Sequence, residues 1–312
     1  MNRSGRESKT PITPTAVGGA SPAVLAAIAF ALLAWASAFI AIREVGRHFS
    51  GGALALARLL VGSGLLGLAL LARRKWLPPT ASEWRQMFIY GVAWFGAYNV
   101  SLNLAERTLD AGTTAMIVNT GPILIALGAG VFFGDGIPKW LMIGTGVAFT
   151  GVVLIGLGSG AAGFGDRSGM RWALLAAVTY AVGMLAQKQA LRRLPALQVT
   201  AVGCMVGALS CLPFLGDLCG ELRNAPAGAI AGAVYLGAVP TALAFSAWAF
   251  ALSKLPAAQL GVTTYAVPPI VVLLGYLRFH EIPAPLAIAG GAVCLTGVAL
   301  ARKKPAAVPR HR

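Results

Sequence analysis

Polar side chains inside long apolar segments are the residues of this sequence that could bind a ligand, because a polar group in apolar surroundings is costly unless it is paired or faces a cavity. Arg58 is the one basic residue well inside such a segment, six residues beyond Gly52 and so about 10 Å from that end of a helix. Its guanidinium could attract a carboxylate, or its long stem could carry the charge back to the surface. The sequence leaves both readings open.

An internal match in the sequence supplies further candidates. Residues 109–154 align without a gap with the chain 146 positions later, so that Pro122 matches Pro268. Positions that are polar or aromatic in both copies are expected to face one shared space. The matched pairs are Asn99 with Phe245 and Asn119 with Tyr265, at the offset of 146, and Trp35 with Tyr180, at an offset of 145. Asn103 and Trp248 lie at helical spacing from members of these pairs, and Ser37 is a weaker candidate. The predicted substrate-binding residues are therefore Trp35, Ser37, Asn99, Asn103, Asn119, Tyr180, Phe245, Trp248 and Tyr265.

The segment that carries the two asparagines 99 and 103 also carries a competing stripe of Tyr90, Trp94, Tyr98 and Ser101. An aromatic stripe at helical spacing more often faces lipid or packs against a neighbouring helix than lines a binding site. We therefore predict that the asparagine face meets the shared space and that this stripe does not.

Pro122 and the pair Pro268 and Pro269 fall at matched positions within apolar segments. A proline there frees a carbonyl group and bends a helix. The two readings are a hinge or gate beside the shared space and a fixed kink for packing; the matched positions favour the hinge.

Residues for catalysis or metal binding are not indicated, and no cofactor is expected. The histidines, His48, His280 and His311, are scattered through loops and a tail, so an intramembrane enzyme is a remote alternative. All ten acidic residues lie in tails, loops or segment ends. Because ion-coupled carriers commonly use a buried carboxylate, facilitated diffusion or exchange is expected.

The elements that must position these residues are membrane-spanning helices. The chain of 312 residues is 57% hydrophobic and 11% charged, with a mean hydropathy of +0.74. Its apolar runs repeatedly reach the roughly 20 residues that cross a bilayer. We predict an all-α polytopic membrane protein with ten transmembrane helices at 23–43, 52–72, 86–105, 111–133, 140–158, 171–191, 196–215, 228–252, 257–278 and 284–301. Residues 1–22 and 302–312 form polar, basic tails, the first expected to be disordered.

Ten spans in two copies give five spans each, and an odd number reverses the second copy in the membrane. We therefore predict two inverted five-helix repeats, 23–158 and 169–301, around a central cavity near the midplane. The net charge of +15 does not indicate a nucleic-acid partner, because Lys and Arg sit in short connecting segments and tails. Most of them fall on the side shared by both tails, so both termini are predicted to be cytoplasmic.

The last predicted span of each copy, 140–158 and 284–301, is rich in small residues. Pairs at a spacing of four let helix backbones approach closely in lipid. The pairs are Gly144 with Ala148, Gly146 with Thr150, and Ala287 with Gly291. These spans are predicted to pack helices together within the chain or to form a homodimer.

Several of these features together resemble one known superfamily. They are Trp35 to Phe39 with a trailing Arg43, Arg58 in the second span, Pro122 before Asp135, and Pro268 before Glu281. The pattern, over residues 23–301, resembles the EamA-type members of the drug/metabolite transporter superfamily. The resemblance implies ten helices around a central cavity and export of small metabolites, with aromatic amino acid exporters of the YddG type as the first comparison. Asp135 followed by Gly136 departs from the usual Glu and basic residue.

The expected function is alternating-access export of small amphipathic metabolites, most simply aromatic or other apolar amino acids, by a multi-pass protein of the cell membrane, the inner membrane in a bacterium. Its partners would be the small-molecule substrate and the lipid bilayer. Two alternatives remain: a carrier of phosphorylated sugars or nucleotide-sugars, which needs several cavity cations, and proton-coupled drug efflux.

Overall fold

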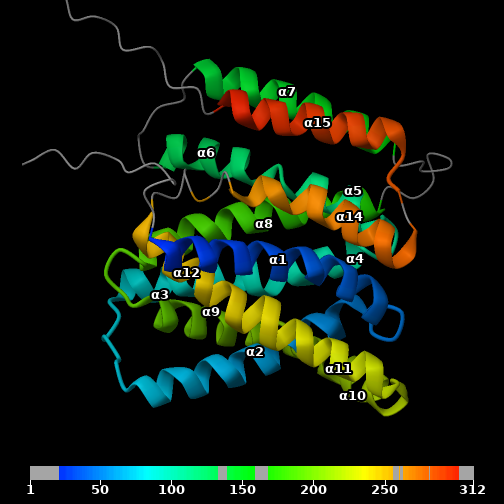
Figure 1. The fold of residues 1–312 in the computed structure, drawn as a ribbon. Coiled ribbons are helices and arrows are strands. Elements are labelled where there is room, and N and C mark those ends of the chain that lie inside the picture. Colours follow the sequence, from blue (N-terminus) through cyan, green and yellow to red (C-terminus); the bar gives the residue numbers. More distant parts are fainter. Residues whose placement is uncertain are drawn as a thin grey trace, which may run out of the picture.

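The protein is a bundle of helices that lie roughly side by side (Figure 1). The computed structural model describes residues 21–132, 139–158, 168–255, 260, 263–280 and 282–301, and these contain no β-strand. The elements of the first half are α1 (Pro22–Val45), α2 (Gly51–Arg73), α3 (Ala81–Tyr90), η2 (Gly91–Ala97), α4 (Tyr98–Ala105), α5 (Ala111–Val118), α6 (Gly121–Phe132) and α7 (Lys139–Gly158). Those of the second half are α8 (Ser168–Ala190), α9 (Ala196–Ser210), η3 (Leu212–Phe214), α10 (Leu215–Asn224), α11 (Ala227–Leu236), η4 (Gly237–Leu243), α12 (Ala244–Lys254), η5 (Thr264–Ala266), α14 (Val267–Phe279) and α15 (Pro285–Ala301).

Helices occupy the apolar segments found in the sequence, and side-chain caps fix several of their starts. The Ser50 hydroxyl accepts a hydrogen bond from the Ala53 amide at 3.3 Å, and the Asp110 carboxylate accepts one from the Thr113 amide at 2.8 Å. By length and composition α1, α2, α8 and Ala227–Lys254 can each cross a membrane, and the bent pair α9 and α10 would make a fifth span. The shorter apolar helices include Thr264–Phe279 and Pro285–Gly297.

The segment at 196–215 does not form the straight span predicted from its hydropathy. Helix α9 ends at Ser210, and the chain turns by 52° through η3 into α10. Pro213 lies in this turn and cannot supply the amide hydrogen that would continue the helix. The Glu221 carboxylate of α10 accepts a hydrogen bond from the Ser50 amide at 3.0 Å, which holds α10 over the start of α2.

Two helices contain a π-helical segment at equivalent places. Helix α3 runs through η2 into α4, and α11 runs through η4 into α12. The two π segments begin 146 positions apart, at Gly91 and Gly237. A Cβ atom added to Gly237 would lie 2.6 Å from the carbonyl oxygen of Arg58 in α2. One added to Gly91 would lie 2.5 Å from the carbonyl oxygen of Gly203 in α9. Each π segment therefore begins where a helix of the other half crosses it.

Helices α7 and α15 pack most closely on each other, at one edge of the bundle (Figure 1). A Cβ atom added to Gly151 would lie 2.6 Å from the Gly290 carbonyl oxygen, and one added to Gly297 would lie 2.6 Å from that of Gly144. The small residues thus bring two backbones together within one chain, which leaves the predicted Gly144 and Ala148 face covered.

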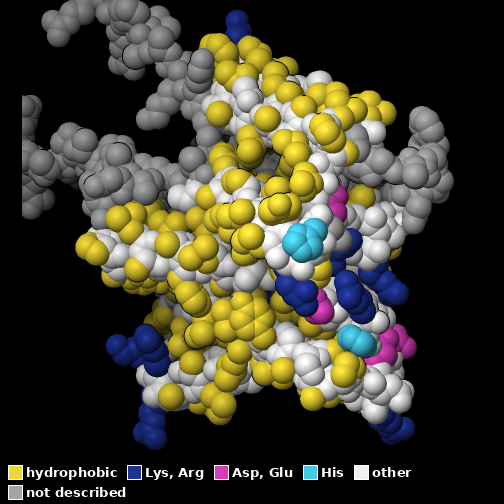
Figure 2. All heavy atoms as spheres, turned by 45° about the vertical axis from the view of Figure 1, so that its right-hand side comes forward, with side chains coloured by type: hydrophobic (Ala, Val, Ile, Leu, Met, Phe, Trp, Pro, Cys, Tyr) yellow, Lys and Arg dark blue, Asp and Glu magenta, His cyan; other side chains and the backbone are white. Residues whose placement is uncertain are grey.

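The outer surface is largely apolar, and charged side chains gather toward the ends of the helices (Figure 2). Large apolar side chains point outward on many helices; examples are Leu68, Phe88, Phe149 and Leu277. A water-soluble protein rarely exposes contiguous apolar surface on this scale, whereas lipid covers it without cost.

A charged pair ties the start of α3 to the chain after α8, ahead of the apolar part of α3. The Nε atom of Arg193 donates to the Glu83 carboxylate at 2.7 Å, and Glu83 also completes a capping box with Thr80. The hydrogen bond from Arg193, followed by that from the Thr80 amide, lowers the pKa of Glu83 from 4.5 to about 2. Because the pKa is depressed in the folded state, the pair stabilises the fold above about pH 4.5, and this contribution disappears as the pH falls through 2.

We expect Arg193→Gln to lower the melting temperature of the purified protein slightly at pH 7, since exposed ion pairs are weak. The difference from wild type should shrink between pH 5 and pH 2. Melting is followed by tryptophan fluorescence in detergent. Arg192→Gln is the matched control, because Arg192 is also exposed and forms no ion pair within the described residues. Equal melting temperatures for the two variants at pH 7 would contradict the assignment.

Candidate functional site

A central cavity lies among α1, α2, η2, α4, α5, α8, α12, η5 and α14, the helices that carry most of the predicted binding residues. Its volume is about 60 Å³, room for a few water molecules and too little for an amino acid. The cavity of this structure is therefore smaller than such a substrate. Its lining residues are Trp35, Ala38, Phe39, Arg58, Trp94, Tyr98, Asn99, Leu102, Val118, Asn119, Tyr180, Phe245, Thr264 and Val267.

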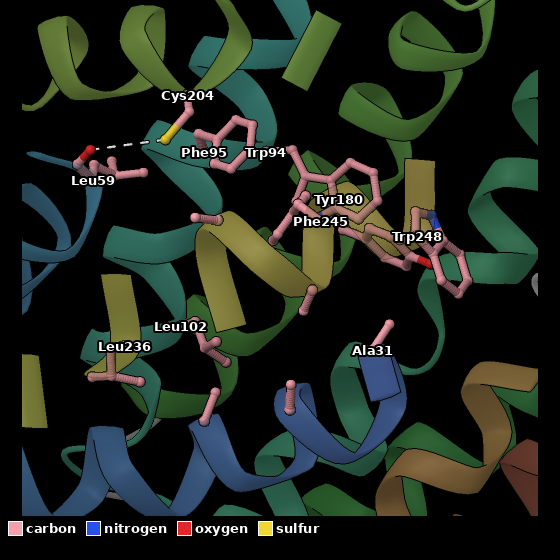
Figure 3. Close-up of a cluster of buried hydrophobic side chains, with 14 of the residues drawn as sticks. Ala31, Leu59, Trp94, Phe95, Leu102, Tyr180, Cys204, Leu236, Phe245 and Trp248 are labelled. Carbon is pink, nitrogen blue, oxygen red and sulfur yellow. Dashed lines mark hydrogen bonds between the residues drawn. The ribbon is translucent and has the colours of Figure 1, made fainter. Parts of the chain in front are cut away.

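Aromatic rings from both halves of the chain form one wall of the central cavity (Figure 3). Trp94 lies at the centre, with ring centroids 4.8 Å from Tyr180 and 5.1 Å from Phe245. Trp35 approaches Phe245 edge-on at 5.4 Å. These distances lie in the range of favourable aromatic pairs, so the wall is a packed surface on which an apolar group can rest.

Trp94 and Tyr98 line the cavity, and the prediction that their stripe faces lipid or only packs was wrong for these two. A regular α-helix would place Trp94 and Asn99 about 140° apart around its axis. The intervening π segment needs more residues for each turn, which brings the two side chains toward one side. Tyr90, of the same stripe, is buried against α8, where its hydroxyl accepts a hydrogen bond from Gln187.

Arg58 is buried beside the cavity, with 3% of its surface exposed, so the alternative in which it reaches the outer surface is wrong. Its Nε and Nη2 atoms donate to the Thr241 hydroxyl at 3.2 and 3.1 Å, and that hydroxyl donates to the Leu236 carbonyl at 2.8 Å. Thr241 belongs to the π segment η4. Within the described part of the chain, Arg58 Nη1 is buried and has no hydrogen-bond partner. One donor of a buried cation thus remains available in the cavity wall.

Two of the three predicted asparagines line the cavity. Asn99 donates to the Phe95 carbonyl at 2.7 Å, and Asn119 donates to the Ala115 carbonyl at 3.1 Å. The Oδ1 atom of Asn119 is buried without a partner among the described residues. Asn103 lies elsewhere: it donates to the Gly51 carbonyl at 2.9 Å and faces a separate cleft.

Three further predicted residues do not line the cavity. Trp248 is fully buried behind the wall, with its ring centroid 4.9 Å from that of Trp35. The Ser37 hydroxyl bonds the Ala34 carbonyl at 2.9 Å and the Tyr235 hydroxyl at 2.7 Å, away from the cavity. Tyr265 packs among α6, α7 and α15, and Thr264 takes its place in the lining because the short 3₁₀ turn η5 changes the facing residue.

Pro122, Pro268 and Pro269 lie in the first turns of α6 and α14 instead of interrupting a continuous helix. A proline is well tolerated there, because the amide hydrogen it lacks would have no partner in the helix. The chain turns at Asn119 and Thr120 before α6, and through η5 before α14. Both breaks lie beside the cavity, while the acidic residues Asp135 and Glu281 lie outside the described residues.

The apolar outer surface and the internal cavity together define a multi-pass membrane protein. The chain belongs to the EamA-like transporter family, which matches it twice, at residues 21–157 and 167–302. The predicted superfamily is thereby confirmed. The chain is a transporter and not an enzyme, since the family and the relatives below are named as transporters.

Relatives cover almost the whole chain. A probable terminal-alkyne amino-acid exporter of Streptantibioticus cattleyicolor is 32% identical over 296 residues, which are 92% of this chain and 97% of the relative. The uncharacterized transporter YdfC of Bacillus subtilis is 33% identical over 270 residues, 85% of this chain and 86% of the relative. A solved crystal structure superposes with a TM-score of 0.63 over 90% of this chain and 96% of the other, at 23% identity, and shows the likeness of the fold alone.

Proposed function

We propose that this transporter exports amino acids with aromatic or other apolar side chains by alternating access. The observation that carries the proposal is the pair of unpartnered buried atoms in the cavity wall, Arg58 Nη1 and Asn119 Oδ1. The first is a cationic donor that matches a carboxylate, and the second is an acceptor that matches an ammonium group. A buried polar atom without a partner is costly, so a ligand that satisfies both gains affinity.

The aromatic wall supports an apolar side chain on the substrate. Trp35, Trp94, Tyr180 and Phe245 offer ring faces and edges for stacking in the same cavity that Arg58 lines. Binding requires the cavity to widen from about 60 Å³, because pockets for small molecules hold about 300 Å³ or more. The breaks beside Pro122 and Pro268 are the proposed hinges for this widening, since a turn absorbs a change of backbone angle more easily than a helix does.

A relative supports the same substrate class. The Streptantibioticus cattleyicolor protein is named as an amino-acid exporter, and the match spans nearly the full length of both chains. A carrier of phosphorylated sugars fits less well, because Arg58 is the single Lys or Arg in the described cavity lining and a phosphate group calls for several cations.

Ten spans in two inverted five-helix repeats, 23–158 and 169–301, are the proposed architecture. The family matches each half separately, and the two π segments begin at the same offset of 146 as the sequence match. Both tails are proposed to face the cytoplasm, and the membrane is the cell membrane. The exposed face of Gly146 and Thr150 remains the proposed surface for a homodimer.

Uncoupled exchange is the proposed mechanism, because no Asp or Glu lines the described part of the central cavity. Glu106 is buried, but it lies in the separate cleft with three arginines. It therefore does not supply a carboxylate to the described lining of the central cavity.

A counterflow assay in proteoliposomes tests the substrate and the mechanism together. Vesicles loaded with unlabelled phenylalanine or leucine are expected to accumulate the labelled amino acid, while vesicles loaded with glutamate or glucose 6-phosphate are not. A pH gradient without internal substrate should not concentrate the label. Exchange of the sugar phosphate alone would overturn the substrate assignment, and accumulation driven by the gradient would overturn the uncoupled mechanism.

A further inference from the structure

A second, larger space lies next to the central cavity along helices α1 and α4. We call it the outer cleft; it is lined by Ile42, Arg43, Gly46, Arg47, Asn103, Glu106 and Arg107. Its volume is about 290 Å³, against about 60 Å³ for the central cavity. In this structure the room for an amino acid is therefore in the outer cleft.

The outer cleft and the central cavity follow successive turns of α1 and α4. On α1, Phe39 lines the cavity and Ile42 lines the cleft, three residues or about 4.5 Å farther along the axis. On α4, Leu102 lines the cavity and Asn103 lines the cleft. Phe39, Ile42 and Leu102 are all buried, and these apolar side chains form a layer at the boundary between the two sets of lining residues.

Of the three arginines that line the outer cleft, one is held by hydrogen bonds and two are not. The Nη1 atom of Arg43 donates to the carbonyl oxygens of Glu106 and Leu109 at 3.2 and 2.9 Å, which fixes Arg43 to the end of α4. Arg47 and Arg107 are exposed and form no hydrogen bond or ion pair within the described residues. Charged and histidine side chains gather on the end of the bundle that Figure 2 brings forward.

Acceptors for a positive group lie in the same cleft. Asn103 is buried to 97% of its surface, and its Oδ1 atom has no partner among the described residues. Glu106, with 3% of its surface exposed, adds a carboxylate. The cleft thus repeats the chemistry of the central cavity: cationic donors beside an unpartnered amide oxygen.

We propose that the outer cleft is a second binding subsite for the zwitterionic end of the substrate, on the path between the central cavity and the side opposite the tails. Arg47 and Arg107 bind the carboxylate, Asn103 Oδ1 and Glu106 bind the ammonium group, and the layer of Phe39, Ile42 and Leu102 is the gate between the two subsites. This inference rests on the proposed amino acid substrate and adds a binding step to it.

The test compares the two faces of the transporter in proteoliposomes. Cys219, the exposed cysteine of α10, lies at the same end of the bundle as the cleft, because α10 is held over the start of α2. Labelling with a membrane-impermeant maleimide therefore reports which face points outward, since the other three cysteines are buried. Vesicles of one orientation are then used for phenylalanine counterflow from each face.

For the double variant Arg47→Gln with Arg107→Gln, we expect the half-saturating phenylalanine concentration to rise roughly tenfold at the cleft face and to stay unchanged at the opposite face. Arg223→Gln is the matched control, because it removes an exposed positive charge at the same end without touching the cleft. Melting temperatures should be equal for all variants, since the substituted side chains are exposed.

Three outcomes would overturn the inference. If wild type exchanges phenylalanine but the double variant matches Arg223→Gln at both faces, the cleft is no subsite while the proposed function stands. If the shift appears only in vesicles with anionic lipid and vanishes in pure phosphatidylcholine, the arginines bind lipid headgroups. If wild type does not exchange phenylalanine at all, both the proposed function and this inference fail.

Discussion

Replacing Arg58 by Gln should abolish most substrate binding while leaving the fold intact. Removing one partner of a buried charge pair costs 2–5 kcal/mol, so the dissociation constant for phenylalanine should rise about thirtyfold or more. Binding to the purified protein is measured by tryptophan fluorescence, because Trp35 and Trp94 line the same cavity. Arg58→Lys should give an intermediate loss, since it keeps the charge and loses the planar fork of donors.

The melting temperature separates this role from a structural one. Arg58 has a buried, unpartnered donor whose removal offsets the loss of its hydrogen bonds to Thr241, so its neutral replacement should change the melting temperature little. Arg73→Gln, at the exposed end of the same helix, is the matched control and should change neither quantity. A variant at position 58 that binds phenylalanine as wild type does, or that unfolds at a much lower temperature, would contradict the assignment.

Replacing Gly237 by Ala should strongly destabilise the crossing of the two halves. Its Cβ atom would lie 2.6 Å from the Arg58 carbonyl oxygen and 2.6 Å from Val61 Cβ, both on α2. A backbone atom cannot turn aside as a side chain can, so the helices must separate, at a cost of about 1–3 kcal/mol. Because Thr241 on the same π segment holds Arg58, transport should fall together with the melting temperature.

Gly228→Ala is the matched control for this prediction. Gly228 lies on α11, which continues into η4, and an added Cβ would meet nothing within 4 Å. Alanine favours a helix over glycine, so this variant should be as stable as wild type or slightly more stable. Equal melting temperatures for the two alanine variants would show that the close approach at Gly237 imposes no constraint.

The sequence predicted where helices form and which two halves meet, because both follow from long apolar runs and a repeat without gaps. It also placed Trp35, Asn99, Asn119, Tyr180 and Phe245 around one cavity, which needs only the offset and the helical period. The sequence could not predict which side chains each helix directs toward the cavity. Trp94 was misplaced because a π segment changes the period, and the start of that segment at Gly91 is visible only as one more matched glycine.

Asn103 and Glu106 show a second limit. Asn103 was assigned to the cavity on the spacing of α4, but its side chain bonds the start of α2 and faces the outer cleft. Glu106 stands at a helix end, yet only 3% of its surface is exposed, and it lines the outer cleft together with three arginines. Both outcomes depend on the packing of separate helices, and sequence spacing within one helix contains no information on it.

The matched π segments also bear on the history of the chain. In the proposed repeat architecture, the extra residue in each helix lies at one offset, so it was present in the ancestral unit before duplication. The cation was not shared in the same way: the position equivalent to Arg58 in the second copy is Gly203, whose carbonyl oxygen meets the first glycine of η2 as that of Arg58 meets the first glycine of η4. The helix crossing is thus shared by the two copies, whereas the buried cation belongs to one of them. For the proposed amino acid substrate, the carboxylate would therefore be held by the first repeat while the substrate occupies the central cavity.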